Sequence, residues 1–166
     1  MLDPYFSLID SDAITFDEAV FLYALIKAIK PKTCIETGTH RGYSASWIGK
    51  ALAENGQGIL YTVDPFDYKQ ENIETEHIIY YRKKGIELPV DKIDFLFIDG
   101  FHGKQDVLEE IEHFWPKLNK GAIVVFHDCD DNELSNKEMV NAAIFEKGLK
   151  TVLIPTKNRM RIYAKN

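Results

Sequence analysis

The stretch from Cys34 to Ser44 constrains this chain more than any other. It begins as an apolar run that ends in the acid Glu36, and it continues through a turn with two glycines, Gly38 and Gly42, into a run typical of a helix. Glycine has no Cβ, so such a turn bends sharply and lets the backbone approach a ligand, and the first N–H groups of the helix point the same way. The pattern predicts a strand, a turn and a helix around a small ligand.

This turn lacks the sequence patterns of phosphate binding. A dinucleotide-binding turn has the pattern G-x-G-x-x-G and a phosphate loop ends in G-K-[ST], and neither occurs here. Glu36 would also repel a pyrophosphate. The residues favour a cationic ligand without phosphate. The candidate contacts in this stretch are Glu36, Gly38, Thr39, Gly42 and Ser44.

The neighbouring segments predict a βαβ unit. A strand is expected at about 33–37, a helix at about 43–54 and a second strand at about 59–64, an order that implies parallel pairing. A preceding helix is predicted from the capping box Thr15–Glu18 and from apolar residues at helical spacing up to Pro31.

The rest of the chain continues this alternation of strands and helices. We expect a strand at 77–81, a strand at 94–98 with an amphipathic helix after it, a strand that begins at Gly121, a helix capped by Ser135–Glu138 that ends near Gly148, and a hairpin formed by 150–155 and 160–164.

Four acids stand at the ends of successive predicted strands: Glu36, Asp64, Asp99 and Asp128. In an open α/β sheet a ligand lies beyond the carboxyl ends of the strands, near the point where the strand order reverses. Any one of these acids taken alone is more readily a capping or solvated loop residue, but four at equivalent ends favour a site. Asp64 is suited to hold both hydroxyls of a ribose.

A divalent-cation site is predicted beyond the reversal. Asp99 and Asp128 would end neighbouring strands, so their carboxylates could converge on one hard cation, for which Mg²⁺ is the natural choice, with His127 or water completing the shell. In the alternative interpretation, Asp99 only starts a turn with Gly100, and Asp128 belongs to a solvated acidic loop at 128–131.

Together these motifs resemble the class I S-adenosylmethionine (SAM)-dependent methyltransferases. The pattern E-x-G-x-x-x-G at 36–42 is similar to their first motif, and 61–64 resembles their second strand. Residues 93–102 resemble the fourth strand of a small-molecule O-methyltransferase branch, and 121–128 resemble the fifth strand. That branch includes metal-dependent enzymes that methylate hydroxyls on sugars of macrolides and related natural products.

The resemblance implies a fold and a cofactor. The expected fold is a single Rossmann-like three-layer α/β domain over 1–166, with a mostly parallel sheet and an antiparallel C-terminal hairpin. SAM would contact the acid-glycine turn together with Asp64 and Asp99. Relatives usually place a helix between the second and third strands, but 65–76 have no sustained apolar period, so that helix is expected to be reduced or absent. Lys83–Gly85 stands where many relatives carry an acid near the adenine.

A catalytic pair is also implied by the resemblance. His102 follows Asp99 by three residues, a spacing that resembles the metal-binding acid and the general base of the sugar O-methyltransferases. A hydroxyl is a poor nucleophile, so a metal ion that lowers its pKa and an imidazole that accepts its proton would solve the problem near neutral pH. The predicted catalytic residues are His102 and Asp99, and the predicted metal ligands are Asp99, His127 and Asp128.

Composition narrows the class of partner. A formal net charge of −6 and a pI near 5.4 argue against a nucleic-acid or anionic-membrane binder and favour a small hydroxylated substrate. The two cysteines, Cys34 and Cys129, form no disulfide pattern, and no leader or membrane-length segment is visible, so a soluble cytoplasmic protein is expected. A homo-oligomer is left open.

Three other functions remain as alternatives. They are a non-catalytic SAM-binding module, a metal-independent methyltransferase acting on nitrogen, and, least favoured, a nucleotide-dependent oxidoreductase. The acceptor and its regiochemistry have no readable determinant in the sequence.

Overall fold

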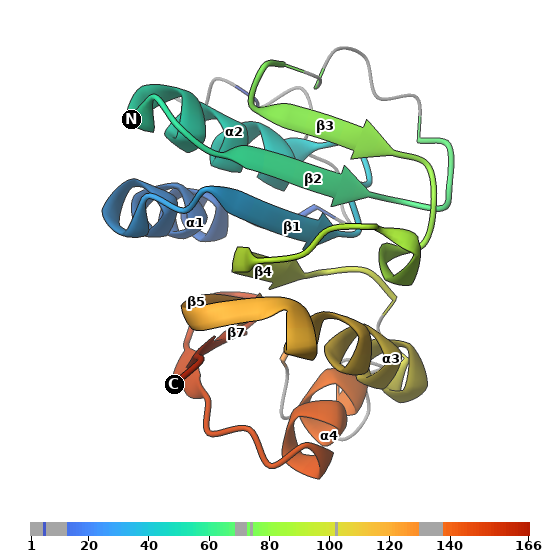
Figure 1. Ribbon diagram of the computed structural model, residues 1–166. Coiled ribbons are helices and arrows are strands. Elements are labelled where there is room, and N and C mark those ends of the chain that lie inside the picture. Colours follow the sequence, from blue (N-terminus) through green and yellow to red (C-terminus); the bar gives the residue numbers. More distant parts are fainter. Residues whose placement is uncertain (1–4, 6–12, 69–72, 74, 102, 130–137) are drawn as a thin grey trace.

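The computed structural model describes residues 5, 13–68, 73, 75–101, 103–129 and 138–166. These residues form one seven-stranded sheet in the order β3-β2-β1-β4-β5-β7-β6 (Figure 1). The strands are β1 (Thr33–Thr37), β2 (Ile59–Val63), β3 (Ile78–Tyr81), β4 (Ile93–Ile98), β5 (Leu118–Phe126), β6 (Val152–Ile154) and β7 (Met160–Ala164). The helices are α1 (Phe16–Ile29), α2 (Tyr43–Asn55), α3 (Lys104–Phe114) and α4 (Glu138–Glu146), and η2 (Gly85–Glu87) and η3 (Trp115–Lys117) are 3₁₀ turns.

The strand pairing places the reversal of strand order between β1 and β4. β1 pairs in parallel with β2 on one side and with β4 on the other, β2 continues to β3, and β4 continues to β5. β7 joins β5 antiparallel and forms a hairpin with β6. The mostly parallel α/β sheet with an antiparallel terminal hairpin is confirmed, and the reversal marks the edge where a ligand site is expected.

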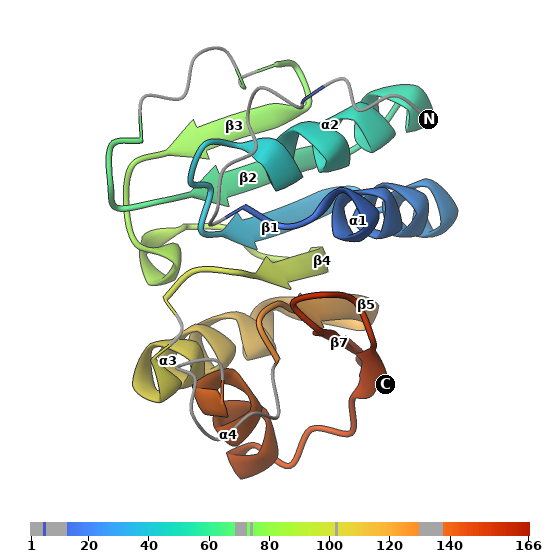
Figure 2. The same ribbon diagram turned by 180° about the vertical axis from the view of Figure 1, so that it is seen from behind.

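Helices cover both faces of the sheet (Figures 1 and 2). Successive side chains of a strand point to opposite faces, so β4 contributes to two cores. Phe95 and Phe97 pack with residues of α1 and α2, whereas Leu96 and Ile98 pack with residues of α3 and α4. All four side chains are at most 2% exposed. Packing on both faces holds the strands in place, and this positions the residues that follow their carboxyl ends.

The first helix begins as the sequence predicts. The backbone N–H of Glu18 donates to Thr15 Oγ1 at 3.4 Å, and the backbone N–H of Thr15 donates to Glu18 Oε2 at 2.8 Å. This reciprocal capping box satisfies two N–H groups that would otherwise lack intrahelical partners. The cap predicted for α4 at residues 135–137 lies outside the described residues.

The predicted start of the fifth strand was wrong. β5 begins at Leu118 and passes through Gly121, where a turn was expected. Leu118 pairs with Ile93, and the register then shifts before Phe95 pairs with Ile123. Gly121 has φ +83°, so it accommodates this irregularity within the strand.

The connection between β2 and β3 departs from the usual alternation. Its described residues, 64–68, 73 and 75–77, contain no helix, in agreement with the missing apolar period.

In the described part of the chain, no helix is both long enough and apolar enough to cross a bilayer.

Candidate functional site

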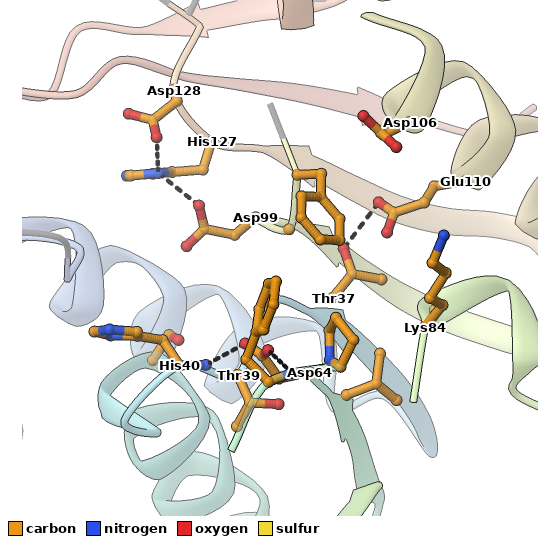
Figure 3. Close-up of a pocket in the computed structure, with 18 of the residues that line it drawn as sticks. Thr37, Thr39, His40, Asp64, Lys84, Asp99, Asp106, Glu110, His127 and Asp128 are labelled. Carbon is orange, nitrogen blue, oxygen red and sulfur yellow. Dashed lines mark hydrogen bonds and ion pairs between the residues drawn. The ribbon is translucent and has the colours of Figure 1, made fainter. Parts of the chain in front are cut away.

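A cavity of about 500 Å³ opens at the carboxyl ends of β1, β2, β4 and β5, beside the reversal of strand order (Figure 3). This volume is in the range of sites for small molecules and cofactors. The lining residues include members of the connections that follow β1, β2, β3, β4 and β5, of the β6–β7 turn, of the segment before α1, and of α3. Of the predicted contacts, Gly38, Thr39, Ser44, Asp64, Asp99, His127 and Asp128 line it.

The two glycines of the first turn are required for different reasons. A Cβ on Gly38 would lie 2.0 Å from the backbone oxygen of Asp99, so only glycine lets β1 and β4 approach at the cavity wall. Gly42 is the N-cap of α2 with φ +84°, and a Cβ there would lie 2.5 Å from Ile73 Cγ2. Gly42 is not among the residues that line the cavity, so its role in the structure is to shape the turn.

Glu36 supports the turn from beneath. It is fully buried, and it accepts a hydrogen bond of 2.5 Å from Thr62 Oγ1, which lies 2.6 Å from Thr39 Oγ1. Burial raises the pKa of Glu36 to about 8. Glu36 does not line the cavity, so the structure places it as a support of Thr39 and does not bring it to the ligand surface as the sequence interpretation expected.

Asp64 is fixed in an orientation that faces the cavity. Its Oδ2 accepts a hydrogen bond from the backbone N–H of His40 at 2.9 Å, and its Oδ1 accepts one from the backbone N–H of Phe66 at 2.9 Å. A carboxylate oxygen can accept more than one hydrogen bond, so both oxygens retain capacity for a ligand diol. His40 has φ +47°, and this backbone conformation brings its N–H to Asp64.

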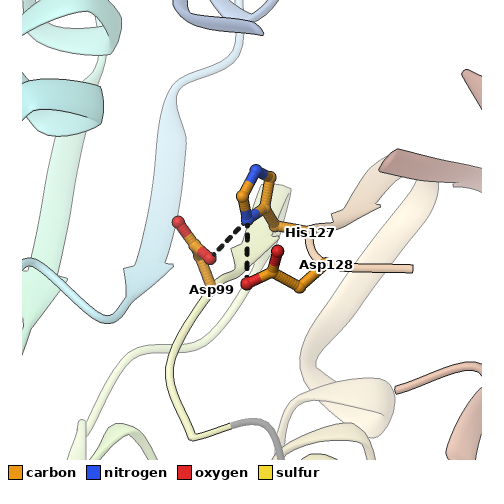
Figure 4. A group of neighbouring side chains, drawn as sticks. All are labelled: Asp99, His127 and Asp128. Carbon is orange, nitrogen blue, oxygen red and sulfur yellow. Dashed lines mark ion pairs between the residues drawn. The ribbon is translucent and has the colours of Figure 1, made fainter. Parts of the chain in front are cut away.

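Asp99, His127 and Asp128 meet at the opposite side of the reversal (Figure 4). His127 Nδ1 lies 2.9 Å from Asp99 Oδ1 and 3.5 Å from Asp128 Oδ2. One ligand-type atom from each residue lies within 4.8 Å of the other two. Among the described residues, His127 Nδ1 is buried and makes no hydrogen bond of normal geometry, although Asp99 Oδ1 lies close to it. Two carboxylates and one imidazole fit a divalent cation.

Helix α1 supplies a further partner for His127. Glu18 Oε2 lies 3.3 Å from His127 Nε2, on the side of the ring away from Asp99. Glu18 also accepts from the backbone N–H of Asn158 at 3.0 Å. Burial acts to lower the pKa of His127, but the carboxylates of Asp99, Asp128 and Glu18 outweigh it and hold that pKa well above its usual value. A metal ion at Nδ1 would compete with this proton, and Nε2 would keep donating to Glu18.

Comparison with known proteins assigns a family to this geometry. A family described as a methyltransferase domain matches residues 35–129, which is more than half of the chain. The chain belongs to this family. The resemblance inferred from the sequence is therefore confirmed. The matched region runs from within β1 to just beyond β5 and contains every predicted cofactor and metal residue.

A curated relative and two solved structures agree with this assignment. Tapetum-specific methyltransferase 1 of Arabidopsis thaliana is 32% identical over 95 residues, which cover 57% of this chain and 37% of that protein. The O-methyltransferase of Bacillus cereus in complex with SAH superposes with a TM-score of 0.75 at 14% identity, covering 96% of this chain and 86% of the other. The O-methyltransferase TomG of Streptomyces achromogenes in complex with SAM gives 0.72 at 15% identity, covering 95% and 84%.

The structural superpositions and the sequence matches each support a limited conclusion. At 14% and 15% identity, the superpositions concern the fold alone. The chain spans 14%, 37% and 47% of the lengths of the three curated relatives that it matches.

The methyltransferase domain also carries an aromatic rim over the cavity. Phe66 contacts Phe101 and Tyr68 edge-to-face, with ring centroids 5.8 and 5.9 Å apart, and all three line the cavity. Trp47, by contrast, is fully buried in the core beside α1. The exposed fractions of Phe66, Tyr68 and Phe101 are 52%, 39% and 42%, so apolar surface remains open at the cavity mouth.

Sequence reasoning did not find two site residues of the domain, Glu18 and Glu110. The sequence indicated Glu18 only as part of the helix cap. Its contact with His127 joins residues that are 109 positions apart, and no local pattern indicates such a contact. Glu110 lies among the buried positions of α3. An acid on the otherwise apolar face of this helix was the feature of the sequence that could have indicated it. His102, the predicted general base, lies outside the described residues.

Proposed function

We propose that this chain transfers the methyl group of SAM to a hydroxyl of a small molecule, with a divalent cation held beside the acceptor. The observation that carries the proposal is that Asp64 and the cluster of Asp99, His127 and Asp128 line one cavity at the reversal of strand order. One end offers a rigid carboxylate suited to a ribose diol, and the other offers a cation site. Members of the family and fold neighbours named as O-methyltransferases support this assignment.

The residues around Asp64 would bind the nucleoside and direct the methyl donor. The ribose hydroxyls would donate to Asp64, whose orientation is already fixed by the N–H groups of His40 and Phe66. The turn at Gly38 and Thr39 would lie close to the methionyl part, because Gly38 leaves no side chain on the cavity wall. SAM supplies an activated methyl group on a cationic sulfonium. The acidic surroundings of the cavity favour that charge.

The second cluster would position and activate the acceptor. Asp99, His127 and Asp128 would hold the cation, which would lower the pKa of a hydroxyl bound beside it. His102 is proposed as the base that takes the hydroxyl proton, on the strength of its spacing from Asp99. The aromatic rim of Phe66 and Phe101 would exclude water from the reacting atoms. We propose a sugar-derived hydroxyl as the acceptor class.

Calorimetric titration with SAM and with S-adenosylhomocysteine (SAH), each in the presence and absence of Mg²⁺, tests the proposal. Wild-type protein should bind both, and Asp64→Ala should weaken SAH about tenfold to a hundredfold, since it removes charge-assisted hydrogen bonds. Asp67→Ala is the matched control, because Asp67 is an exposed acid on the same connection. Unchanged SAH affinity in Asp64→Ala would refute the placement of the ribose.

An activity screen of the wild-type protein distinguishes the remaining alternative functions. A screen of hydroxylated sugars and phenols for methyl transfer, with and without chelator, should show activity that the chelator abolishes. Activity on amines that resists the chelator would indicate a metal-independent N-methyltransferase. Tight SAH binding without transfer to any acceptor would indicate a non-catalytic SAM-binding module.

A further inference from the structure

Glu110 is a buried acid that faces the cavity from α3. Its side chain lies at the end of the cavity away from His127 and Asp128 (Figure 3). The residue is only 8% exposed, and Thr37 Oγ1 donates to its Oε2 at 3.0 Å. Within the described part of the chain, Thr37 is the one hydrogen-bond partner found for this carboxyl. An acid in such a position loses much of its hydration, so it is expected to have a polar partner.

The second oxygen of Glu110 lies between two glycines of the cavity wall. A Cβ on Gly85 would lie 3.1 Å from Glu110 Oε1, and a Cβ on Gly100 would lie 3.3 Å from the same oxygen. Gly85 follows β3 and Gly100 follows β4, so the backbones of two connections pass Oε1 with no side chain in between. Both backbones therefore pack closely on Oε1, and Glu110 lines the cavity together with these two glycines.

The proposed function determines which group that is, and the inference rests on it. If the ribose lies on Asp64 and the sulfonium points to Asp99 and His127, the base must extend toward the other end of the cavity. That end is formed by η2 after β3, by Gly100 and by α3. The base of SAM is adenine, whose 6-amino group is a hydrogen-bond donor. A carboxyl oxygen is its natural acceptor.

We propose that Glu110 accepts a hydrogen bond from the 6-amino group of the adenine and thereby selects adenine over bases with a carbonyl at that position. Thr37 holds the carboxyl in place from the end of β1, and the backbones of the two glycines pack against Oε1 at the cavity wall. Burial raises the pKa of Glu110 to about 7, so the side chain is mostly ionised at pH 8 and can then only accept hydrogen bonds.

The test compares SAH with S-inosylhomocysteine, in which a carbonyl oxygen replaces the 6-amino group. Calorimetry at pH 8 should show that wild-type protein strongly prefers SAH, because the carbonyl would face the ionised Glu110. Glu110→Ala should weaken SAH about tenfold and remove most of the preference. Glu110→Gln should keep SAH near wild-type affinity and gain affinity for S-inosylhomocysteine, since an amide can both accept and donate.

Two controls make the outcome decisive. Glu112→Gln removes the same charge from an exposed position of α3 that does not line the cavity, and it should leave the preference unchanged. If Glu110→Ala fails to fold, Glu110→Gln carries the test. A preference that stays at the wild-type value in both Glu110 variants overturns this inference, and Glu110 then serves only to bind Thr37. Failure of wild-type protein to bind SAH at all overturns the proposed function and this inference with it.

Discussion

Glu18 and Glu36 are two fully buried glutamates whose surroundings hold their protons in opposite ways. Glu18 lies 3.3 Å from the imidazole of His127. Burial acts to raise its pKa, but the hydrogen bond and charge of His127 outweigh burial, and the net shift is downward. Glu36 has the hydroxyl of Thr62 as a neighbour, and burial raises its pKa to about 8. A cation nearby, and not the depth of burial, decides whether the carboxyl stays charged.

This difference distinguishes the surroundings of His127 from the support beneath the glycine turn. Around His127, charges of both signs lie together, and in the proposed function a metal ion would replace a proton on its imidazole. Beneath the glycine turn, Glu36 holds a proton near neutral pH and serves as a hydrogen-bonding support for Thr39. Glu110 resembles Glu36, because burial raises its pKa to about 7 as well. These buried acids therefore fall into two groups, those that face the imidazole of His127 and those that hydrogen bond to hydroxyls.

The largest effect is expected at the cation-binding end. The double variant Asp99→Asn, Asp128→Asn removes both negative ligands, so turnover should fall by about a thousandfold and Mg²⁺ binding should be lost, because a cation contributes several kcal/mol to charge stabilisation. Turnover in a Mg²⁺ series and calorimetry measure the two effects. Asp130→Asn and Asp131→Asn, in the adjoining acidic run, serve as controls. Full Mg²⁺ affinity in the double variant would contradict the site.

The raised pKa of Glu36 should make the free energy of unfolding depend on pH. A carboxyl with a raised folded pKa favours the folded state below its unfolded pKa, so stability falls as pH rises from about 4.5 to about 8. Glu36→Gln cannot ionise and should raise the free energy of unfolding at pH 8 by roughly 4 kcal/mol, since each unit of the pKa shift from 4.5 to about 8 is worth about 1.4 kcal/mol. Urea titrations at pH 5 and pH 8 measure this.

The control for Glu36 is its counterpart Glu18. Because the pKa of Glu18 is lowered, its contribution is present above the unfolded pKa and is lost as pH falls below about 4.5. Glu36→Gln should leave that acidic limb intact. Equal unfolding free energies of Glu36→Gln and wild type at pH 8 would show that Glu36 is not a proton-holding support.

The catalytic base gives the next largest effect. If His102 takes the proton of the acceptor, His102→Gln should lower turnover by about a hundredfold, because glutamine can hydrogen bond but cannot accept the proton. SAH affinity should stay near wild type, and the acidic limb of the pH profile should disappear. Single-turnover methyl transfer across a pH series measures both. A fully active variant would move the base to His127 or to solvent at the metal site.

Local sequence signals predicted most of the fold. The capping box at Thr15 and the glycines of the turn act over a few residues, so the start of α1 and the strand-turn-helix unit follow from the chain itself. The start of β5 did not follow in this way. Leu118 is drawn into the strand by its pairing with Ile93, a contact between segments that are 25 positions apart.

The site was predictable where an acid ends a strand. Asp64, Asp99 and Asp128 reach the cavity because parallel strands end at the same edge of the sheet. Glu36 lies one residue before the end of β1, where it pairs with Thr62 of the neighbouring strand and accepts a hydrogen bond from its hydroxyl within the protein. Whether a terminal acid faces the ligand or the protein depends on such cross-strand contacts, which the sequence of one strand does not contain.

The smallest effect tests whether Glu18 supports the metal site or only caps a helix. Glu18→Gln keeps the capping-box pattern, since glutamine also serves at this position, but it removes the charge that faces His127 Nε2. Mg²⁺ affinity should fall by about tenfold, as is typical when a partner of a metal-ligating histidine is lost. The melting temperature near neutral pH should also fall, because the variant loses the stability that ionised Glu18 contributes above its unfolded pKa. Asp17→Asn, which removes an acid from the same first turn of α1, is the matched control. If Glu18→Gln binds Mg²⁺ as tightly as Asp17→Asn does, the contact between α1 and His127 contributes to packing alone.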